Sequence, residues 1–205
     1  HIHSDLIAGL PGEDLASFEA GFNRLLALDP QEIQLGILKR LRGAPIDRHT
    51  RDWNMVYSPH APYEILSTDL VSFEEMQRIQ RFARYWNLVV NNGRFINAAP
   101  LIWQNTPSAF SAFMEFSDWL YAKTDATGNL HMVRLAKLML CFLTDEKGLD
   151  EEMAATALCV DYRRGDRTDI PGFLKKYAGR SGQTGEDTAL ELVSQSTRQK
   201  RHRSS

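Results

Sequence analysis

Residues 1–14, HIHSDLIAGLPGED, open on an apolar stretch that turns at once through a run rich in glycine and proline. Residues 2–9, IHSDLIAG, predict a β-strand, because this stretch ends at a turn rich in glycine and proline. Residues 15–29, LASFEAGFNRLLALD, carry apolar side chains at helical spacing, and residues 32–41, EIQLGILKRL, predict a second strand. A helix joins the two strands, so we expect them to pair in parallel as a βαβ unit. One such unit cannot close a sheet, and further strands are expected beside it.

The helix expected over residues 15–29 has its own start signal and apolar face. Asp14 stands where an N-cap residue is needed, since its carboxylate can accept from the first free backbone N–H groups. The residues expected on the buried face are Leu15, Phe18, Phe22, Leu25 and Leu26.

The rest of the chain changes from irregular to helical. Residues 46–67 hold Pro59 and Pro62 and little periodicity, which predicts an irregular connector with a short extended piece at 54–58. Downstream, Ser72 and Glu75 stand in capping-box positions. Four helices are expected, over residues 72–91, 108–124, 129–148 and 149–165, with stops at Gly128, Gly148 and Gly165.

These patterns divide the chain into parts. We expect a βαβ unit over 1–45, a connector over 46–67, a helical domain over 68–177 and a flexible tail over 178–205. The tail carries Arg198, Lys200, Arg201 and Arg203 and nothing apolar that could hold it down, so it is expected to be solvated.

Composition bounds the class of protein. The chain has 205 residues, of which 43% are hydrophobic, and a net charge of −2, so no overall basic field favours nucleic acid as a partner. No apolar run approaches the roughly 18 residues of a membrane helix, so a soluble, cytoplasmic protein is expected. Cys141 and Cys159 each lie in an apolar helical stretch, which predicts buried free thiols in a reducing compartment.

Two segments resemble a known family. "DLIAGLPGE" at 5–13, followed by "QLGILKRLRGAPI" at 34–46, resembles the late strands of radical S-adenosylmethionine enzymes. The resemblance is closest to the cobalamin-binding subgroup, whose members end in an uncharacterised helical domain that begins with a segment like "YSPHAPYEIL", here residues 57–66. It implies an α/β plus all-α chain, in which the terminal βαβ unit of a partial (β/α)6 TIM-type barrel precedes a helical domain.

The resemblance also implies residue roles. Asp5 would accept hydrogen bonds from the ribose hydroxyls of S-adenosylmethionine, as a carboxylate can for a vicinal diol. Ile7 and Gly9 would flank the adenine, and Ile37 and Leu38 would offer backbone and apolar contacts from the next strand. The role of Glu13 stays open, because the general family motif has glycine in place of Asp5 and a different spacing to the glutamate. The alternative is a plain parallel strand with a Gly/Pro turn and a helix-capping acid.

Two readings of function follow. In the first, the chain is the C-terminal part of a radical S-adenosylmethionine iron–sulfur enzyme, an oxidoreductase or transferase that acts on a small molecule, with cobalamin bound by a preceding domain. The C-x3-C-x2-C motif of the 4Fe–4S cluster is not in this sequence, so we expect no catalytic or metal-ligating residue, no bound cofactor and no activity from the chain alone. In the second, it is a non-catalytic helical interaction module. Either way, the unpaired sheet edge predicts self-association.

Two further segments and the histidines complete the candidates. Within residues 83–95, Tyr85, Trp86, Asn91, Asn92 and Phe95 could line a pocket in which Arg84 or Arg94 meets an anionic substrate; otherwise these aromatics are core and the asparagines end a helix. The run at 110–121 places Phe110, Phe113, Met114 and Trp119 on a core-facing helix. The histidines, His1, His3, His49, His60 and His131, are expected to be exposed or locally bonded rather than metal ligands.

Overall fold

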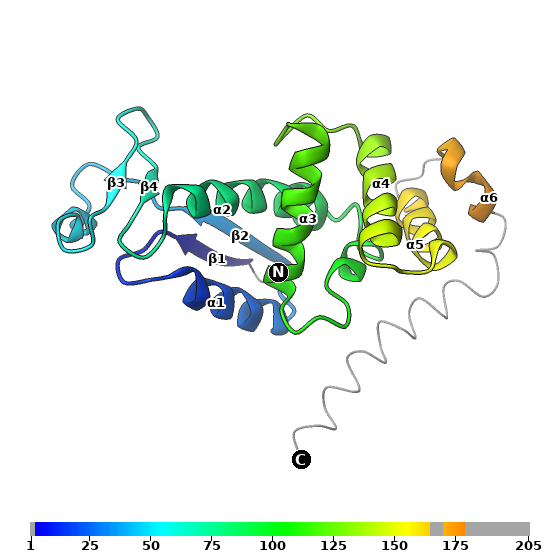
Figure 1. Ribbon diagram of the computed structural model, residues 1–205, viewed down its shortest axis with the longest axis horizontal. Coiled ribbons are helices and arrows are strands. Elements are labelled where there is room, and N and C mark those ends of the chain that lie inside the picture. The colour runs from blue at the N-terminus through cyan, green and yellow to red at the C-terminus, as the bar shows by residue number, and fades with distance from the viewer. Residues whose placement is uncertain (1–2, 165–169, 179–205) are drawn as a thin grey trace, which may run out of the picture. The chain divides into compact units, whose positions relative to one another are not determined.

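The computed structural model describes residues 3–164 and 170–178, and these form a mixed α/β chain that is mostly helical (Figure 1). Two small two-stranded sheets accompany the helices, and the described residues form no closed barrel. The chain divides into two compact units. The first holds the residues up to Asn92 together with Trp103–Asn129, and the second holds Gly93–Ile102 and the residues from Leu130 onward.

The first unit begins with the βαβ unit that the sequence predicts. Strand β1 (His3–Ala8) and strand β2 (Glu32–Ile37) pair in parallel over six residues, and helix α1 (Leu15–Ala27) joins them. The prediction of parallel pairing is thus confirmed. Strand β2 is shorter than the predicted 32–41, because the chain beyond Leu38 leaves β1 and bonds to residues 63–65 instead.

Helix α1 starts with a complete capping box. The Asp14 carboxylate accepts from the Ser17 backbone N–H at 2.7 Å, and the Ser17 hydroxyl accepts from the Asp14 N–H at 3.1 Å. Phe18 and Phe22 are buried on the apolar face, so the predicted cap and the centre of that face are confirmed. The other three predicted apolar residues, Leu15, Leu25 and Leu26, are half-buried.

The connector contains more structure than its prolines suggest. It holds the 3-10 helix η1 (Pro45–His49) and an antiparallel pair, β3 (Val56–Tyr57) with β4 (Ile65–Ser67). The extended piece predicted at 54–58 is confirmed, whereas nothing in the sequence pattern indicated β4.

The helix predicted over 72–91 exists but changes its winding. Helix α2 (Phe73–Trp86) starts with the predicted capping box, in which the Ser72 hydroxyl accepts from the Glu75 N–H at 3.2 Å. It continues as a π-helical segment, η2 (Asn87–Asn91).

Helix α3 (Ala109–Thr124) follows with Ser108 as its N-cap. The predicted stop at Gly128 is wrong, because Asp125 already takes the left-handed conformation, with φ of 48°, directly after the helix. Aspartate tolerates this conformation better than most residues.

An aromatic cluster forms the core of the first unit. Phe22 of α1 meets Phe82 and Trp86 of α2 edge-on, with ring centroids 5.3 and 4.8 Å apart. Phe82 and Trp86 each lie 5.0 Å from Phe113 of α3. Phe110, Phe113 and Met114 are buried as predicted, while Trp119 is half-buried.

The described part of the second unit contains helices and connecting turns but no strand. Its elements are η3 (Ala99–Ile102), α4 (Met132–Cys141), the π-helical η4 (Phe142–Glu146), α5 (Glu151–Arg163), η5 (Gly172–Leu174) and α6 (Lys175–Ala178). Gly148, with φ of 65°, ends the α4–η4 segment as predicted, and Gly165 lies outside the described residues. Cys159 is buried as expected, but the expectation of burial is wrong for Cys141, which is half-buried.

A buried carboxylate ties this second unit together. Asp161 of α5, only 4% exposed, accepts from the backbone N–H groups of Asn97 at 2.9 Å and Ala98 at 2.9 Å, and from the Asn97 side-chain amide at 2.8 Å. Burial raises the pKa of Asp161 above its usual value, against the opposing effect of these hydrogen bonds. The segment that leads into η3 is therefore anchored to α5 by one side chain.

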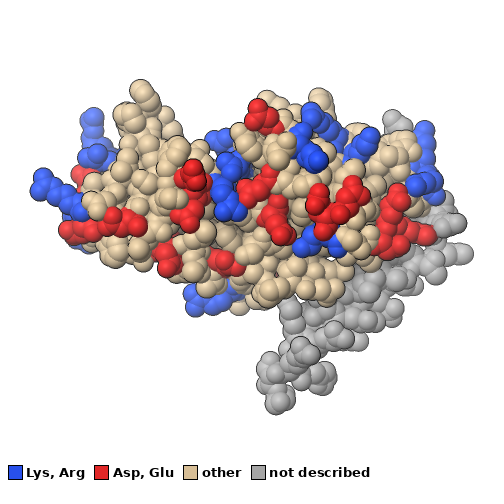
Figure 2. All heavy atoms as spheres, viewed as in Figure 1, with Lys and Arg blue, Asp and Glu red and all other residues tan. Residues whose placement is uncertain are grey.

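The domain limits expected at 1–45, 46–67 and 68–177 stay predictions, and the expected tail lies almost entirely outside the described residues. Within the described ranges, no helix combines the length and the apolar character needed to cross a membrane. Acidic and basic side chains are interspersed on the face that Figure 2 presents.

Candidate functional site

The face of the β1–β2 sheet that carries Asp5 and Ile7 is the candidate site. Successive side chains of a strand point to opposite faces, and parallel partners share a face. His3, Asp5 and Ile7 of β1 therefore lie on the same side as their partners Glu32, Gln34 and Gly36 of β2. We call this set the open sheet face, because all three β1 residues are exposed. At one end of this face, His3 of β1 contacts its partner Glu32 of β2, with His3 Nδ1 2.9 Å from Glu32 Oε2.

Asp5 is the acceptor at the centre of the open sheet face. The structure gives its carboxylate no hydrogen bond or ion pair among the described residues. Its neighbour Ile7 is 43% exposed and lies beside Gly36, at which a Cβ would be 3.7 Å from Ile7 Cγ1. A carboxylate and an exposed apolar side chain thus stand next to one another on one strand.

Gly9 directly follows β1, and side chains of β4 and α2 pack closely against it. Its φ is +89°, and a Cβ there would lie 2.6 Å from Ile65 Cγ2 and 3.2 Å from Met76 Cε. Glycine is required by the backbone conformation and by the close approach of β4 and α2. The sequence did not indicate these two contacts, since both partners lie far along the chain.

Ile37 and Leu38 are placed differently from Asp5 and Ile7. Ile37 pairs with Ala8, so its half-buried side chain lies on the face opposite the open one. The Leu38 N–H donates to Ala8 O at 3.0 Å, and its carbonyl accepts from the Ile65 N–H at 2.8 Å. Both polar backbone groups of Leu38 are therefore already bonded. The ligand-binding roles expected for Asp5, Ile7, Gly9, Ile37 and Leu38 stay predictions.

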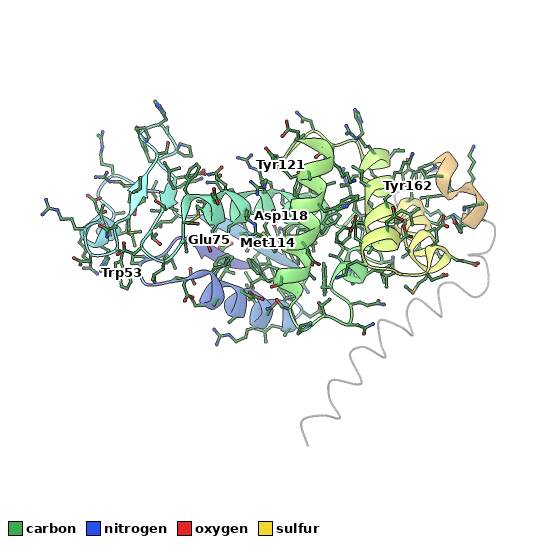
Figure 3. All side chains as sticks on the ribbon, viewed as in Figure 1. Trp53, Glu75, Met114, Asp118, Tyr121 and Tyr162 are labelled. Carbon is green, nitrogen blue, oxygen red and sulfur yellow. The ribbon has the colours of Figure 1, made fainter. Side chains whose placement is uncertain are left out.

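Glu13 is an unsatisfied acceptor just after the turn that follows β1. Burial, with a smaller contribution from the neighbouring Asp14 charge, raises the pKa of this half-buried carboxyl. Its Oε2 is buried and has no hydrogen-bond partner among the described residues. The turn itself is covered by Trp53, whose ring would lie 3.2 Å from a Cβ at Gly12 (Figure 3). An acceptor without a donor therefore lies at the same end of β1 as Gly9.

The two edges of the sheet differ. Leu38 directs its N–H at β1, and backbone groups alternate along a strand, so the carbonyl of Ile33 points away from β1. That carbonyl accepts from the Asn91 side-chain amide at 3.0 Å, and residues 63–65 bond to 38–40 further on. The outer edge of β2 is thus bonded at Ile33, and the chain just beyond the strand is bonded to residues 63–65. Strand β1 pairs only with β2 among the described residues.

The hypothesis of a pocket lined by the aromatics of residues 83–95 is wrong. Tyr85 and Trp86 are at most 1% exposed within the first unit, and Phe95 is 1% exposed within the second. The Tyr85 hydroxyl donates to Ala126 O at 2.6 Å, and the Asn91 side-chain amide donates to the Ile33 carbonyl of β2 at 3.0 Å. The three aromatic residues serve the core and Asn92 is the C-cap of η2, as the alternative has it.

The histidines form no cluster in the described part of the chain, where no three His, Cys, Asp or Glu side chains gather as metal ligands do. His49 accepts through Nε2 from Arg48 Nε at 3.0 Å, and His131 is the N-cap residue of α4.

The fold and the open sheet face define a class: a mixed α/β chain with one parallel βαβ unit, a polar accessible sheet face and a helical remainder. The chain belongs to the family described as protein of unknown function DUF4080, whose model matches residues 51–201. No curated protein matches it. The family match begins after β2, so the open sheet face lies outside it.

Proposed function

We propose that this chain is the C-terminal part of a radical S-adenosylmethionine iron–sulfur enzyme, an oxidoreductase or transferase whose preceding domain binds cobalamin. In this proposal β1 and β2 are the last strands of a partial (β/α)6 barrel. The open sheet face points into that barrel, and the helical remainder lies near a small-molecule substrate.

The observation that carries the proposal is the Asp5 carboxylate on the open sheet face of a parallel βαβ unit, which has no hydrogen bond or ion pair to the residues that the structure describes. In barrels of this type ligands bind at the C-terminal ends of the strands, which for β1 is the end that Gly9 and Glu13 follow, while Asp5 lies further back on the same strand. Support also comes from the difference between the edges, because Asn91 occupies the outward carbonyl of Ile33 on β2, while β1 pairs only with β2 among the described residues and can accept another strand.

The residues present fit S-adenosylmethionine better than they fit a 4Fe–4S cluster or cobalamin. Asp5 can accept from a ribose diol, Ile7 offers an apolar surface, and the unsatisfied Glu13 oxygen can accept from a donor. When bound at a 4Fe–4S cluster, S-adenosylmethionine supplies radical chemistry by reductive cleavage. The sequence has two cysteines, one short of the usual cluster motif, so the cluster belongs to other residues in this proposal, and cobalamin to the preceding domain.

A non-catalytic interaction module is the second candidate. It is favoured by the Leu38 backbone groups, which are already bonded, and by Gly9, whose conformation and packing are explained without a ligand. In that case the βαβ unit is a docking surface.

The deciding experiment has two stages. The gene that encodes this chain is read upstream of His1, where the proposal expects a C-x3-C-x2-C motif. The protein of the whole reading frame is then reconstituted anaerobically with iron and sulfide, and its affinity for S-adenosylmethionine is measured by calorimetry. Asp5→Asn is expected to weaken that affinity about tenfold, since hydrogen bonds to a charged group contribute roughly 1.5 to 3 kcal/mol.

The matched control is Asp52→Asn, which removes the same charge from an exposed position with no bond among the described residues. It should leave the affinity unchanged. If Asp5→Asn lowers thermal stability but not affinity, Asp5 is a structural residue of β1 and the interaction module is the better interpretation. Absence of the cysteine motif upstream would end the enzyme proposal.

A further inference from the structure

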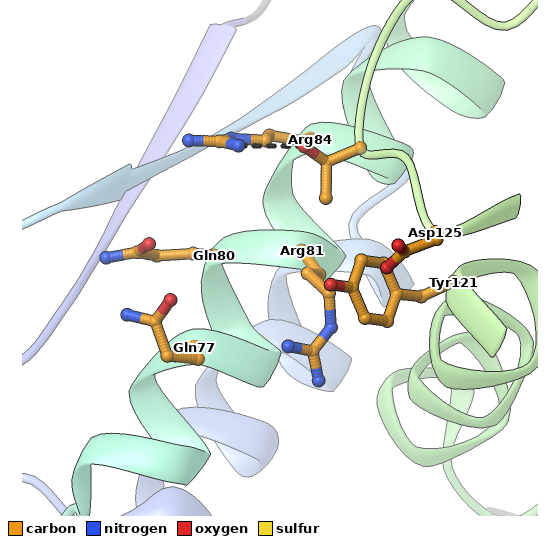
Figure 4. A pocket seen from close by; sticks show the side chains of 7 residues that line it. Gln77, Gln80, Arg81, Arg84, Tyr121 and Asp125 are labelled. Atoms are coloured by element: carbon orange, nitrogen blue, oxygen red, sulfur yellow. Dashed lines mark hydrogen bonds between the residues drawn. The ribbon is translucent and has the colours of Figure 1, made fainter.

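A concave site, separate from the open sheet face, lies on the first unit between α2 and the end of α3. Figure 4 shows the side chains that line it, and its volume is about 270 Å³. Helix α2 contributes Gln77, Gln80, Arg81 and Arg84, which follow one another at helical spacing along a single stripe. Tyr121 and Asp125 line it from α3 and its C-cap. This site is independent of the open sheet face and of the proposed enzyme activity.

Hydrogen-bond donors dominate this hollow. Gln77 and Gln80 have no hydrogen bond to their side-chain amides among the described residues. The Nε of Arg81 is buried and has no hydrogen-bond partner in the described part of the chain. Buried donors without partners are uncommon in folded proteins, because each costs the free energy of its lost hydration.

Arg81 is held in place by neighbours that leave much of its capacity unused. Its guanidinium carbon lies 4.7 Å from the centroid of the Tyr121 ring. Its Nη2 is 3.4 Å from Asp118 Oδ1, a long contact. The other Asp118 oxygen is already bonded by Arg78, through Nη2 at 2.7 Å and Nε at 3.0 Å. Asp118 is therefore largely neutralised by Arg78, and Arg81 is positioned without being saturated.

Arg84 has even fewer partners. The structure gives it one hydrogen bond among the described residues, from Nη1 to the hydroxyl of Thr127 at 2.9 Å, and no carboxylate. The hollow thus contains two guanidinium groups and one acid, Asp125, which leaves an excess of one positive charge. Planar guanidinium groups match the oxygens of carboxylates and phosphates with two hydrogen bonds at once.

We infer that this hollow, which we call the α2–α3 pocket, binds an oxyanion, the carboxylate or phosphate group of a small polar molecule. Arg81 and Arg84 supply the charge and the planar donors. Gln77 and Gln80 supply neutral donors, and Asp125 limits the net charge that the pocket accepts. The volume suits the anionic group and a few further atoms rather than a large cofactor.

The test is an NMR titration of the isotope-labelled chain of residues 1–205, with inorganic phosphate and acetate as probes and sodium chloride at equal ionic strength as reference. Phosphate or acetate should shift the Nε–H signals of Arg81 and Arg84 and the backbone amides of residues 77–84 and 121–127. The expected dissociation constant is on the order of 1 mM. A response to phosphate alone identifies a phosphorylated ligand, and a response to both identifies oxyanions generally.

Three variants sharpen the result. Arg84→Gln should weaken binding about tenfold, since it removes a charged donor from an exposed position without touching the core. Asp125→Asn should instead tighten binding about two- to fivefold by removing the repelling charge, and asparagine tolerates the left-handed backbone there. Arg24→Gln, an exposed arginine of α1 outside the pocket, is the control for net charge and should change nothing.

The inference fails if chloride produces the same shifts, if Arg24→Gln weakens binding as much as Arg84→Gln, or if neither probe moves the pocket signals. A weaker response in Asp125→Asn would also overturn it, because the sign of the charge effect would then be wrong.

Discussion

Gly9 shows how one residue can be fixed by two separate demands. Its φ of +89° disfavours any side chain, and the space for a Cβ is taken by Ile65 Cγ2 at 2.6 Å. Gly9→Ala should therefore lower the free energy of unfolding by about 2 to 4 kcal/mol, from backbone strain and from overpacking together. Urea unfolding followed by tryptophan fluorescence measures this loss.

Gly43 provides the matched control. It has φ of +79°, but a Cβ there would meet nothing within 4 Å. Gly43→Ala should cost only about 1 kcal/mol, the contribution of the backbone alone. Equal losses for the two variants would show that the contact with Ile65 is relaxed by movement of that side chain.

Asp161 makes the second unit sensitive to pH. Because burial raises its folded pKa above 3.8, the folded state binds the proton more tightly than the unfolded state does. Its contribution to stability is then greatest below pH 3.8 and is lost as the pH rises through the folded pKa. Thermal unfolding by circular dichroism should show this decline in the native chain and not in Asp161→Asn.

The same variant also removes a multiple acceptor. In asparagine an NH₂ group replaces one of the two carboxylate oxygens that accept from the Asn97 and Ala98 N–H groups, so one donor loses its acceptor. Asp161→Asn should therefore lower the free energy of unfolding by about 1 to 3 kcal/mol near neutral pH. Asp145→Asn, an exposed change whose partner is the adjacent Thr144, should lose little. A native chain whose stability instead rises through this pH range would contradict the direction of the Asp161 shift.

Residue signals in the sequence were reliable where they act locally. The caps at Asp14 and Ser72 depend on partners three residues away, and both are as predicted. The contacts of Gly9 with Ile65 and Met76, and the state of Glu13, depend on segments that only folding brings together.

At the scale of elements, α1 and α3 are joined by a polar cluster at the start of α3. The Ser108 hydroxyl accepts from its own helix at Ser111 N, accepts from the Asn23 amide at 2.9 Å and donates to Glu19 of α1. Ser108→Ala should cost about 2 kcal/mol, because it removes the cap and also leaves partners on α1 unsatisfied. Urea unfolding of the chain measures it.

Ser72 is the comparison, since its capping box with Glu75 is confined to α2. Ser72→Ala should cost about 1 kcal/mol, as an ordinary N-cap does. A loss at Ser108 no larger than that at Ser72 would mean that Glu19 and Asn23 find water instead.

Helix existence could be predicted from periodicity, but helix winding could not. The predicted helix over 72–91 is present, yet its last turn is π-helical and places Asn91 on the Ile33 carbonyl. That bond joins segments distant in sequence, so periodicity carries no information about it. Strand β4 could not be predicted for a related reason, because its three residues are too few to show an alternating pattern and their partners lie elsewhere in the chain.

For the whole molecule, the side of β1 that faces away from β2, where the described residues place no further strand, predicts association of the chain with itself. An exposed strand with free N–H and C=O groups offers a template for another strand. Light scattering should show a mass that rises with concentration, and Ile7→Lys should abolish the rise by placing a charge on that strand. The control is Val56→Lys on β3, which also replaces an exposed β-branched residue, 51% exposed against 43% for Ile7.

A compact monomer at all concentrations would show that β1 is protected in some other way. Equal effects of both lysine variants would mean that general charge repulsion, rather than the strand, controls association.

The candidate site could be predicted from the sequence as a set of positions but not as a surface. Asp5 and Ile7 do share one exposed face, which the strand period implies. Ile37 falls on the other face, since its position follows from the register with Ala8, and register was not contained in either segment alone. The α2–α3 pocket combines α2 with residues beyond 120, and Arg84 is the only lining residue that the sequence pattern indicates as a candidate for binding an anion.

The Asn91 amide on the Ile33 carbonyl also limits the stoichiometry of any assembly. Growth of a filament requires two different surfaces on each subunit, so that every added copy leaves a new site for the next one. Among the described residues, that bond and the contacts of residues 38–40 obstruct both ends of the outer edge of β2, which leaves β1 as the strand edge open to a neighbour. Two copies that meet through it are related by a two-fold axis and use up each other's edge, so assembly through this sheet ends at a dimer.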